Sequence, residues 1–278
     1  MPIVVVPVIA AVVLLLAVCA CFSGCYTIKQ GATFLSYLGQ AIPLEDLLAR
    51  QPKAGKSGNA AFNSGEAETN RVFAERVQDI RSFAMNELGL SMSKNYTRYV
   101  QLDRDYIAAI VSACAPDSFT AHKWKFPVVG SMPYKGFFSL DDAYKEKDKL
   151  QKKELDVWLR YTDAFSTLGW FKDPLYSYMK KYSVDRLASL IIHELTHATV
   201  FVKNNMDFNE KIAEITGTEG ARLYIESRFG IDSDEYREMQ TGEADSKAFV
   251  AFILELAAEL EALYAGEKSR EEKLAEKA

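Results

Sequence analysis

The stretch His193-Glu194-Leu195-Thr196-His197 decides how the rest of this chain can be interpreted. It has the form H-E-x-x-H, in which two histidines four positions apart lie on one face of a helix and can reach the same ion. The chain has only 3 histidines, and two of them are in this stretch. Glu194 lies one step around the helix, where its carboxylate can act on a water as general base and then general acid. The motif therefore predicts a helix that carries a catalytic zinc ion.

The residues around the motif favour a helix over 184–202. Ser183 can cap its first turn, and Asp185 suits the positive end of the helix dipole. Apolar residues recur at helical spacing and predict a face that packs into a core: Leu187, Leu190, Ile191, Leu195 and Ala198. The alternative is a surface helix with two ordinary histidines.

A catalytic zinc site needs a third protein ligand, and no further histidine follows the motif. The third ligand must then be a carboxylate, and Glu210, which opens the next predicted helix, is the first candidate. Glu214 lies one turn further on, where it can accept the second N–H of a ligand histidine. Glu214 or Glu219 remains an alternative ligand. Asp207-x-x-Glu210 also has the form of a capping box, in which Glu210 would only bond to the backbone.

The chain begins with a leader that carries no charge. Residues 1–24 contain no charged side chain, and 3–22 form an apolar run of 20 residues, long enough to span a bilayer. Ser23, Gly24 and Cys25 look like a lipobox, which predicts a lipoprotein signal peptide over residues 1–24 and a lipid on Cys25. The alternative is an uncleaved membrane anchor. Both attach the protein to the bacterial cell envelope, facing the periplasm or the exterior.

The rest of the chain has the composition of a globular protein. A net charge of -5 gives no electrostatic reason to expect nucleic-acid binding. Four cysteines are too few for a disulfide scaffold, and Cys114 is expected to be a buried free thiol. We expect one catalytic domain over residues 25–265 and a charged flexible tail over 266–278.

Several parts of the sequence resemble known families. The motif followed by Asn209, Glu210 and Glu214 resembles the gluzincin metallopeptidases, in which an Asn-Glu pair supplies the third ligand. Three further stretches resemble, in order, the bacterial family of predicted aminopeptidases: 126–138, 166–174 and 191–202. That likeness covers most of residues 25–228, and members of this family are often lipoprotein-like.

The resemblance implies a zinc peptidase whose substrate is a peptide. It also implies aminopeptidase activity, that is, removal of the N-terminal residue. It implies a mostly helical α+β fold of the zincin type, with a small mixed sheet and an active-site helix pair. Asn209 and Glu214 would support the ligands. Members often carry paired cysteines near Lys125 and Ser131, and this chain has cysteine at neither position.

Peptide hydrolysis also needs groups that bind the substrate. In gluzincins an edge strand binds extended peptide, and residues 161–170 are the candidate, with Ser166, Thr167 and Leu168 central; a plain core strand is the alternative. Tyr134 and Tyr224 are candidate oxyanion donors, although a tyrosine more often has a packing role.

Recognition of a free amino terminus needs an acidic anchor, and the sequence does not choose between Asp163, Asp173 and Glu219. Two other function classes stay open. One is an envelope lipoprotein that uses the metal structurally or as an adaptor, and Glu194 argues against it because a structural site needs no acid or base. The other is a metal-dependent hydrolase of a non-peptide amide.

Overall fold

The structure is a computed structural model that describes the following residues: 26, 29–48, 64–126, 130–163, 173–203 and 205–277. The predicted signal peptide and Cys25 lie outside them, as do Ser166, Thr167 and Leu168 of the predicted substrate strand. None of the helices in the described part combines the length and the apolar character that crossing a membrane requires.

The chain forms two compact units. Unit 1 comprises Met1–Gly39, Tyr106–Phe165 and Leu254–Ala278, and unit 2 comprises Gln40–Asp105 and Ser166–Ile253. Helices dominate the chain and both units contain a small sheet, so the predicted α+β, mostly helical class is what the structure has. The zincin-type fold and the domain limits at 25 and 265 stay predictions.

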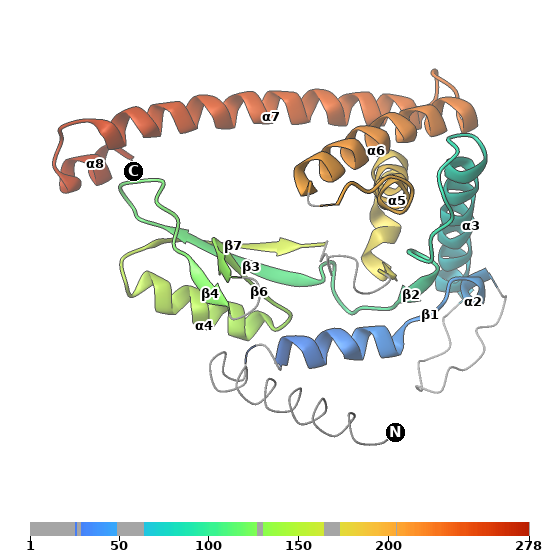
Figure 1. The fold of residues 1–278 in the computed structure, drawn as a ribbon, viewed down its shortest axis with the longest axis horizontal. Coiled ribbons are helices and arrows are strands. Elements are labelled where there is room, and N and C mark those ends of the chain that lie inside the picture. Colours follow the sequence, from blue (N-terminus) through green and yellow to red (C-terminus); the bar gives the residue numbers. More distant parts are fainter. Residues whose placement is uncertain are drawn as a thin grey trace. The chain divides into compact units, whose positions relative to one another are not determined.

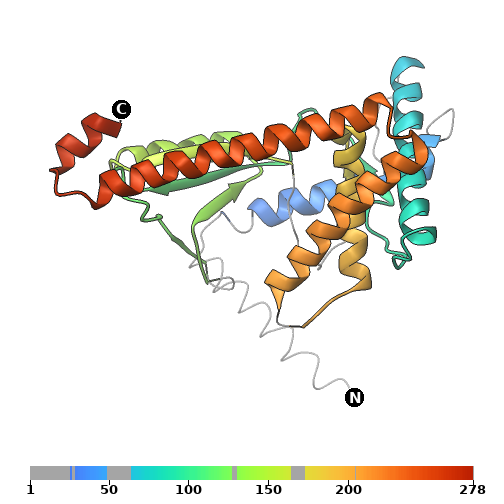
Figure 2. The same cartoon turned by 90° about the horizontal axis from the view of Figure 1, so that it is seen from above.

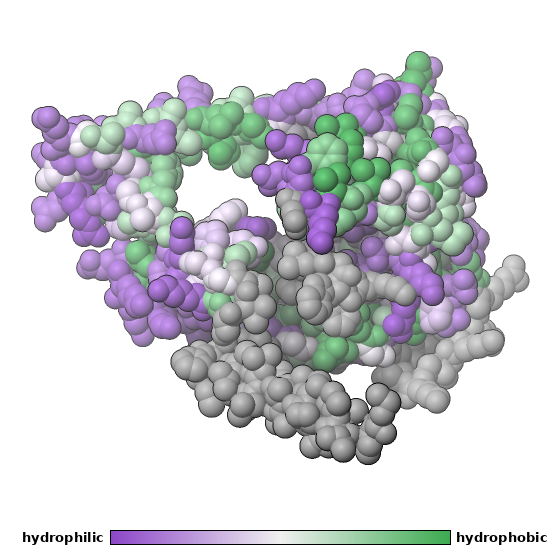
Figure 3. Space-filling view, in the orientation of Figure 1, coloured by the Kyte–Doolittle hydropathy of each residue, from purple (hydrophilic) through white to green (hydrophobic). Residues whose placement is uncertain are grey.

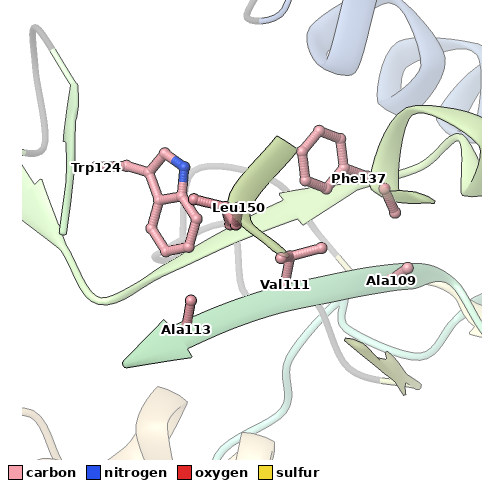
Figure 4. Packing of buried hydrophobic residues seen from close by; sticks show 7 residues of the cluster. Ala109, Val111, Ala113, Trp124, Phe137 and Leu150 are labelled. Atoms are coloured by element: carbon pink, nitrogen blue, oxygen red, sulfur yellow. The ribbon is translucent and has the colours of Figure 1, made fainter. Parts of the chain in front are cut away.

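Unit 1 is built on a three-stranded antiparallel sheet. Strand β3 (Ala108–Cys114) lies between β6 (Tyr134–Phe137) and β7 (Asp156–Thr162). Alternate residues of β3 are buried, because successive side chains of a strand point to opposite faces. One face packs on α4 (Leu140–Gln151), and Figure 4 shows the apolar cluster that results. Its buried members are Ala109, Val111, Ala113, Trp124, Phe137, Ala143 and Leu150.

A second antiparallel pair in unit 1 joins β4 (Trp124–Phe126) to β5 (Gly130–Met132). Its register places Lys125 directly opposite Ser131. The two positions where the resembling family often carries cysteines are therefore cross-strand neighbours here.

Unit 2 contains a mixed three-stranded sheet in the order β1-β2-β8. Strand β2 (Arg98–Val100) pairs antiparallel with β1 (Ile42–Pro43) and parallel with β8 (Leu175–Tyr176). The strands are very short, so helices supply most of the buried surface of this unit. The helices and the 3-10 turn are α2 (Glu45–Leu48), α3 (Ser64–Asn86), η1 (Ser177–Lys181), α5 (Val184–Thr199) and α6 (Met206–Arg228).

Helix α7 (Asp234–Ala265) begins in unit 2 and ends in unit 1. Its middle exposes large apolar side chains, and Figure 3 shows them in green along the helix. The exposed residues are Phe249, Val250, Phe252, Ile253, Leu254 and Leu256.

The predicted flexible tail contains a helix instead. Residues 266–278 include α8 (Arg270–Lys277), and the prediction of a flexible segment missed its start signal. Ser269 and Glu272 form a reciprocal cap, in which the Ser269 N–H donates to Glu272 at 2.8 Å and the Glu272 N–H donates to Ser269 at 3.3 Å. Lys277 also pairs with Asp156 of β7. The cap and the ion pair therefore stabilise a helix in a segment whose high charge content had suggested an irregular structure.

Candidate metal centre

Helix α5 presents the H-E-x-x-H motif at the edge of the unit 2 core. Three residues of its predicted apolar stripe are buried, namely Leu187, Ile191 and Leu195, each at most 1% exposed. Leu190 is half-buried and Ala198 is exposed, because the stripe leaves the core towards the end of the helix. His193 and His197 follow this stripe around the helix and remain half-buried. Ser183 occupies the N-cap position, but its side chain makes no capping hydrogen bond, which corrects the predicted cap.

Helix α6 lies beside α5 (Figure 1 and Figure 2), and small residues make this close approach feasible. A Cβ on Gly217 would lie 2.8 Å from the backbone oxygen of Ser189 and 3.2 Å from the Cβ of His193. Only glycine leaves room at this point. The buried small residues lie three, four, seven or eight positions apart, or side by side, and so share one face of the helix: Ala213, Gly217, Gly220 and Ala221. The same face reaches Glu210 one turn earlier, which brings that carboxylate towards α5.

The connector between the two helices is fixed by Asn209, which is 1% exposed. Its amide oxygen accepts the Val202 N–H at 2.8 Å, and its amide nitrogen donates to the Val202 carbonyl at 2.9 Å. Asn209 therefore supports the site through the connector backbone rather than through a histidine ring. Asn205 caps α6 by accepting the Phe208 N–H at 3.3 Å.

This cap decides between the two interpretations of Glu210. Asp207 lies inside the first turn of α6 and is not the cap, so the capping-box alternative is wrong. The carboxylate of Glu210 instead faces the two histidines. Its oxygens lie 3.6 Å from Nε2 of His193 and 3.6 Å from Nε2 of His197. The two Nε2 atoms are 3.1 Å apart.

Three potential ligand atoms thus converge from two helices, all within 4.8 Å of one another. Two imidazole nitrogens and one carboxylate oxygen form a donor set that could hold a divalent metal ion. Burial lowers the pKa of His193, and the neighbouring His197 lowers it further. A lowered pKa keeps the imidazole neutral at pH 7, which is the form that binds a metal.

Glu194 lies beside this group in a partly buried position. Burial raises its pKa to about 7, and the charges of Asp173 and Glu210 contribute to the increase. A carboxylate with a pKa near neutrality can both accept and release a proton at physiological pH. Its environment therefore suits the acid-base role that the motif predicts.

Two groups elsewhere in unit 2 interact electrostatically with Glu194. Tyr96 is 4% exposed, and its pKa is raised well above the ordinary value by burial and then by the charges of Glu194 and Asp173. Burial also raises the pKa of Asp173 to about 6. The Tyr96 N–H donates to the Asp173 carbonyl at 2.9 Å, next to the pairing of β2 with β8. Sequence reasoning missed Tyr96, because no periodic pattern links it to the motif.

A family model described as "Putative aminopeptidase" matches residues 25–278 of the chain. The chain belongs to this aminopeptidase family. The match covers every residue of the candidate metal centre, all of unit 2, and unit 1 from residue 25 onwards. No curated protein and no solved structure matches the chain.

Some predicted site residues of this aminopeptidase family member have other roles. Tyr224 is 2% exposed and donates its hydroxyl to Asp79 at 2.8 Å, so it ties α6 to α3. That bond corrects its assignment as an oxyanion donor, because the hydroxyl is already used inside the core. Glu219 pairs with Arg222 at 2.7 Å on the exposed side of α6, which removes it as an alternative ligand.

The remaining predicted residues contribute less to the centre. Glu214 is exposed on α6, and its charge raises the pKa of His193. Within the described residues it makes no hydrogen bond to either histidine, so its support is electrostatic. Tyr134 begins β6 in unit 1 and is 44% exposed, and its role stays a prediction.

Proposed function

We propose that this member of the aminopeptidase family is a zinc-dependent metallopeptidase of the gluzincin type. His193, His197 and Glu210 hold Zn²⁺, and the substrate is a peptide from which the N-terminal residue is removed. The observation that carries the proposal is the convergence of three ligand atoms beside the carboxylate of Glu194.

The spacing of the donor atoms supports zinc. Zinc binds imidazole nitrogen and carboxylate oxygen at about 2.0–2.2 Å, so two ligands of a tetrahedral site are about 3.3 Å apart. The separations of 3.1, 3.6 and 3.6 Å lie close to this value. Three protein ligands leave one tetrahedral position open, which is the arrangement of catalytic zinc sites and not of structural ones.

The chemistry follows from the groups around that open position. Bound zinc would make water a stronger acid and polarise the carbonyl of the peptide bond. Glu194 accepts a proton at its carboxylate as water oxygen attacks the carbonyl carbon. It then donates that proton to the amide nitrogen as the C–N bond breaks, which releases a free amine and a carboxylic acid. Asn209 keeps Glu210 in place by fixing the connector that precedes it.

We also propose that the protein is tethered to the cell envelope by a lipid on Cys25. The family match begins at Cys25, the residue that cleavage of the predicted signal peptide would make the N-terminus. Incorporation of labelled palmitate that is lost in Cys25→Ser supports the tether. Equal labelling of both proteins, or labelling of neither, contradicts it.

Replacing Glu194 by glutamine tests the hydrolytic role. Glu194→Gln is expected to retain about one zinc per chain and to lose at least about 100-fold in kcat/KM, because the proton acceptor is absent. Glu219→Gln is the matched control, because this acid lies on the same pair of helices but is bonded to Arg222. Zinc content and cleavage of free and N-blocked peptides are measured for each protein.

The outcomes separate the function classes. One zinc per chain without cleavage of any peptide by the unmodified protein favours a metal-dependent adaptor. Cleavage of blocked peptides only contradicts aminopeptidase activity and keeps the peptidase. Equal activity of Glu194→Gln and the unmodified protein overturns the mechanism.

A further inference from the structure

The segment that joins α5 to α6 exposes five large apolar side chains. Val200, Phe201 and Val202 follow the last turn of α5, and Met206 and Phe208 lie in the first turn of α6. Their exposed fractions run from 39% for Val200 to 65% for Phe201. Single apolar residues are common on a protein surface, whereas a group of them marks a place where another molecule binds.

Two of these residues continue the helix faces that carry the metal-ligand candidates. Val200 follows His197 by three positions, and its N–H still bonds to the Thr196 carbonyl at 2.8 Å, so α5 keeps its geometry up to this point. Met206 precedes Glu210 by four positions on α6. Residues three or four apart on a helix are surface neighbours, with Cβ atoms about 5–6 Å apart. Val200 therefore borders His197, and Met206 borders Glu210.

The connector is fastened beside the centre at Val202. The side chain of Asn209 bonds to both the N–H and the carbonyl of Val202, at 2.8 and 2.9 Å. The Asn205 N–H donates to the same carbonyl at 3.3 Å. These three bonds tie Val202 to the turn that carries Glu210. A ligand that packs here meets a backbone that is already ordered, so little further chain entropy is lost on binding.

The charges around this apolar group do not favour a membrane as its partner. The charged residues of the same stretch are three acids and two lysines: Asp207, Glu210, Glu214, Lys203 and Lys211. Such a mixture has no basic excess that would draw it to anionic lipids. A peptide whose scissile carbonyl lies at the metal position, by contrast, has its nearest side chains beside the ligands, where Val200 and Met206 lie.

We propose that Val200 and Met206 form an apolar subsite of the metal centre, which binds a large apolar side chain of the peptide next to the scissile bond. The inference rests on the proposed function of the same centre and names its substrate class: peptides with leucine, or a residue of similar size and polarity, at that position. Packing of such a side chain on Val200 and Met206 removes apolar surface of both partners from water.

Matched tetrapeptides test the assignment. Leucine replaces alanine at either the first or the second position of tetra-alanine. For one of the two leucine peptides kcat/KM is expected to be about 10-fold higher than for tetra-alanine, because its extra methyl and methylene groups leave water. Val200→Thr and Met206→Gln keep the approximate size of each side chain but make it polar. Together they are expected to reduce the preference to about 2-fold or less.

Ile215→Thr is the matched control. Ile215 is a 60% exposed apolar residue of α6 that follows Met206 by nine positions, or two and a half turns, and so lies on the opposite side of the helix. This variant is expected to keep the leucine preference. Zinc content and melting temperature are measured for every variant and are expected to be unchanged, because the substituted side chains are exposed. Loss of zinc from the double variant would assign the two residues to ligand positioning and overturn the subsite.

Binding gives a readout that does not depend on turnover. In the zinc-loaded Glu194→Gln protein, calorimetry is expected to show about 10-fold tighter binding of one leucine peptide than of tetra-alanine. Adding Val200→Thr and Met206→Gln is expected to abolish that difference. Equal binding of the leucine peptides and tetra-alanine, or a preference that survives the two substitutions, overturns the inference.

Two further outcomes are distinct from these. Binding to phosphatidylcholine vesicles that the double variant loses, with an unchanged leucine preference, assigns the apolar group to a membrane contact and overturns the subsite. Absence of cleavage by the unmodified protein overturns the proposed function instead, and the binding preference still decides whether Val200 and Met206 form a subsite.

Discussion

Replacing Gly217 by alanine is expected to disturb the metal centre without changing any proposed ligand. The added Cβ would lie 2.8 Å from the backbone oxygen of Ser189 and 3.2 Å from the Cβ of His193, whereas ordinary contact begins at 3.4 Å. Because a backbone oxygen cannot rotate away, α6 must move from α5 by about 0.6 Å, the difference between 3.4 and 2.8 Å. Glu210 lies on the same face of α6 and moves with it.

The expected effect has two components. Overpacking at a helix contact costs about 1–3 kcal/mol, and alanine recovers about 1 kcal/mol through its higher helix propensity. The free energy of unfolding should therefore fall by about 0–2 kcal/mol. A metal centre tolerates displacements of only about 0.5 Å, so zinc affinity should fall by about 10- to 100-fold.

Zinc affinity is measured by competition with a fluorescent chelator, and the free energy of unfolding by urea titration. Gly242→Ala on α7 is the matched control, because nothing lies within 4 Å of its added Cβ. In this control the free energy of unfolding should rise by up to about 1 kcal/mol through the higher helix propensity of alanine, and zinc affinity should be unchanged. If Gly217→Ala gains as much stability as the control and binds zinc with unchanged affinity, the argument from close packing is refuted.

Three further predictions follow from the same contacts. Asn209→Ala is expected to lower the free energy of unfolding by about 1–2 kcal/mol and zinc affinity by about 10-fold, because the connector loses two hydrogen bonds. Calorimetry measures the stability and chelator competition measures the zinc affinity. Unchanged zinc affinity contradicts the role of Asn209 in positioning Glu210. Tyr224→Phe is expected to cost about 1 kcal/mol and to leave kcat/KM unchanged, since its hydroxyl is bonded within the core; a 100-fold loss of kcat would restore the oxyanion role. In the metal-free protein, Glu194 and Asp173 together are expected to lower the free energy of unfolding by about 2–3 kcal/mol from pH 5 to pH 8, after allowing for screening, while the lowered pKa of His193 acts in the opposite direction. The sign follows because the pKa values of Glu194 (about 7) and Asp173 (about 6) are raised, so the folded chain binds these protons more tightly. Urea titrations in the presence of a chelator measure this fall as the difference between the unmodified protein and the double variant Asp173→Asn/Glu194→Gln. The same pH dependence in both proteins contradicts the prediction.

The sequence predicted best what depends on local periodicity. Helix α5 was expected over 184–202 and runs over Val184–Thr199. This segment has apolar residues at the spacing that a helix with one buried face requires. The convergence of Glu210 on the motif was predicted from the chemistry of a zinc site.

Other features had a signal that was not used. Gly217 and Gly220 are spaced for one helix face, and such spacing predicts a close helix contact. Ser269 and Glu272 have the capping-box spacing that starts α8. In both cases a short local pattern predicted the feature, but the composition of the surrounding segment suggested otherwise.

The electrostatic interaction of Tyr96 and Asp173 with Glu194 had no such signal. It depends on the parallel pairing of β2 with β8, two strands of 3 and 2 residues that are far apart in the sequence. Strands this short carry no alternation, so only the folded chain brings these groups together. The roles of Asn209 and Tyr224 likewise depend on single tertiary hydrogen bonds.

X-ray absorption at the zinc edge tests the central claim most directly. The zinc-loaded protein is expected to show two imidazole nitrogens at about 2.0–2.1 Å and carboxylate or water oxygen at about 2.0–2.2 Å, without sulfur. The imidazole signal should halve in His193→Ala and disappear in the double variant with His197→Ala. A spectrum of hydrated zinc without imidazole, or one with a sulfur ligand from Cys114, would contradict the site.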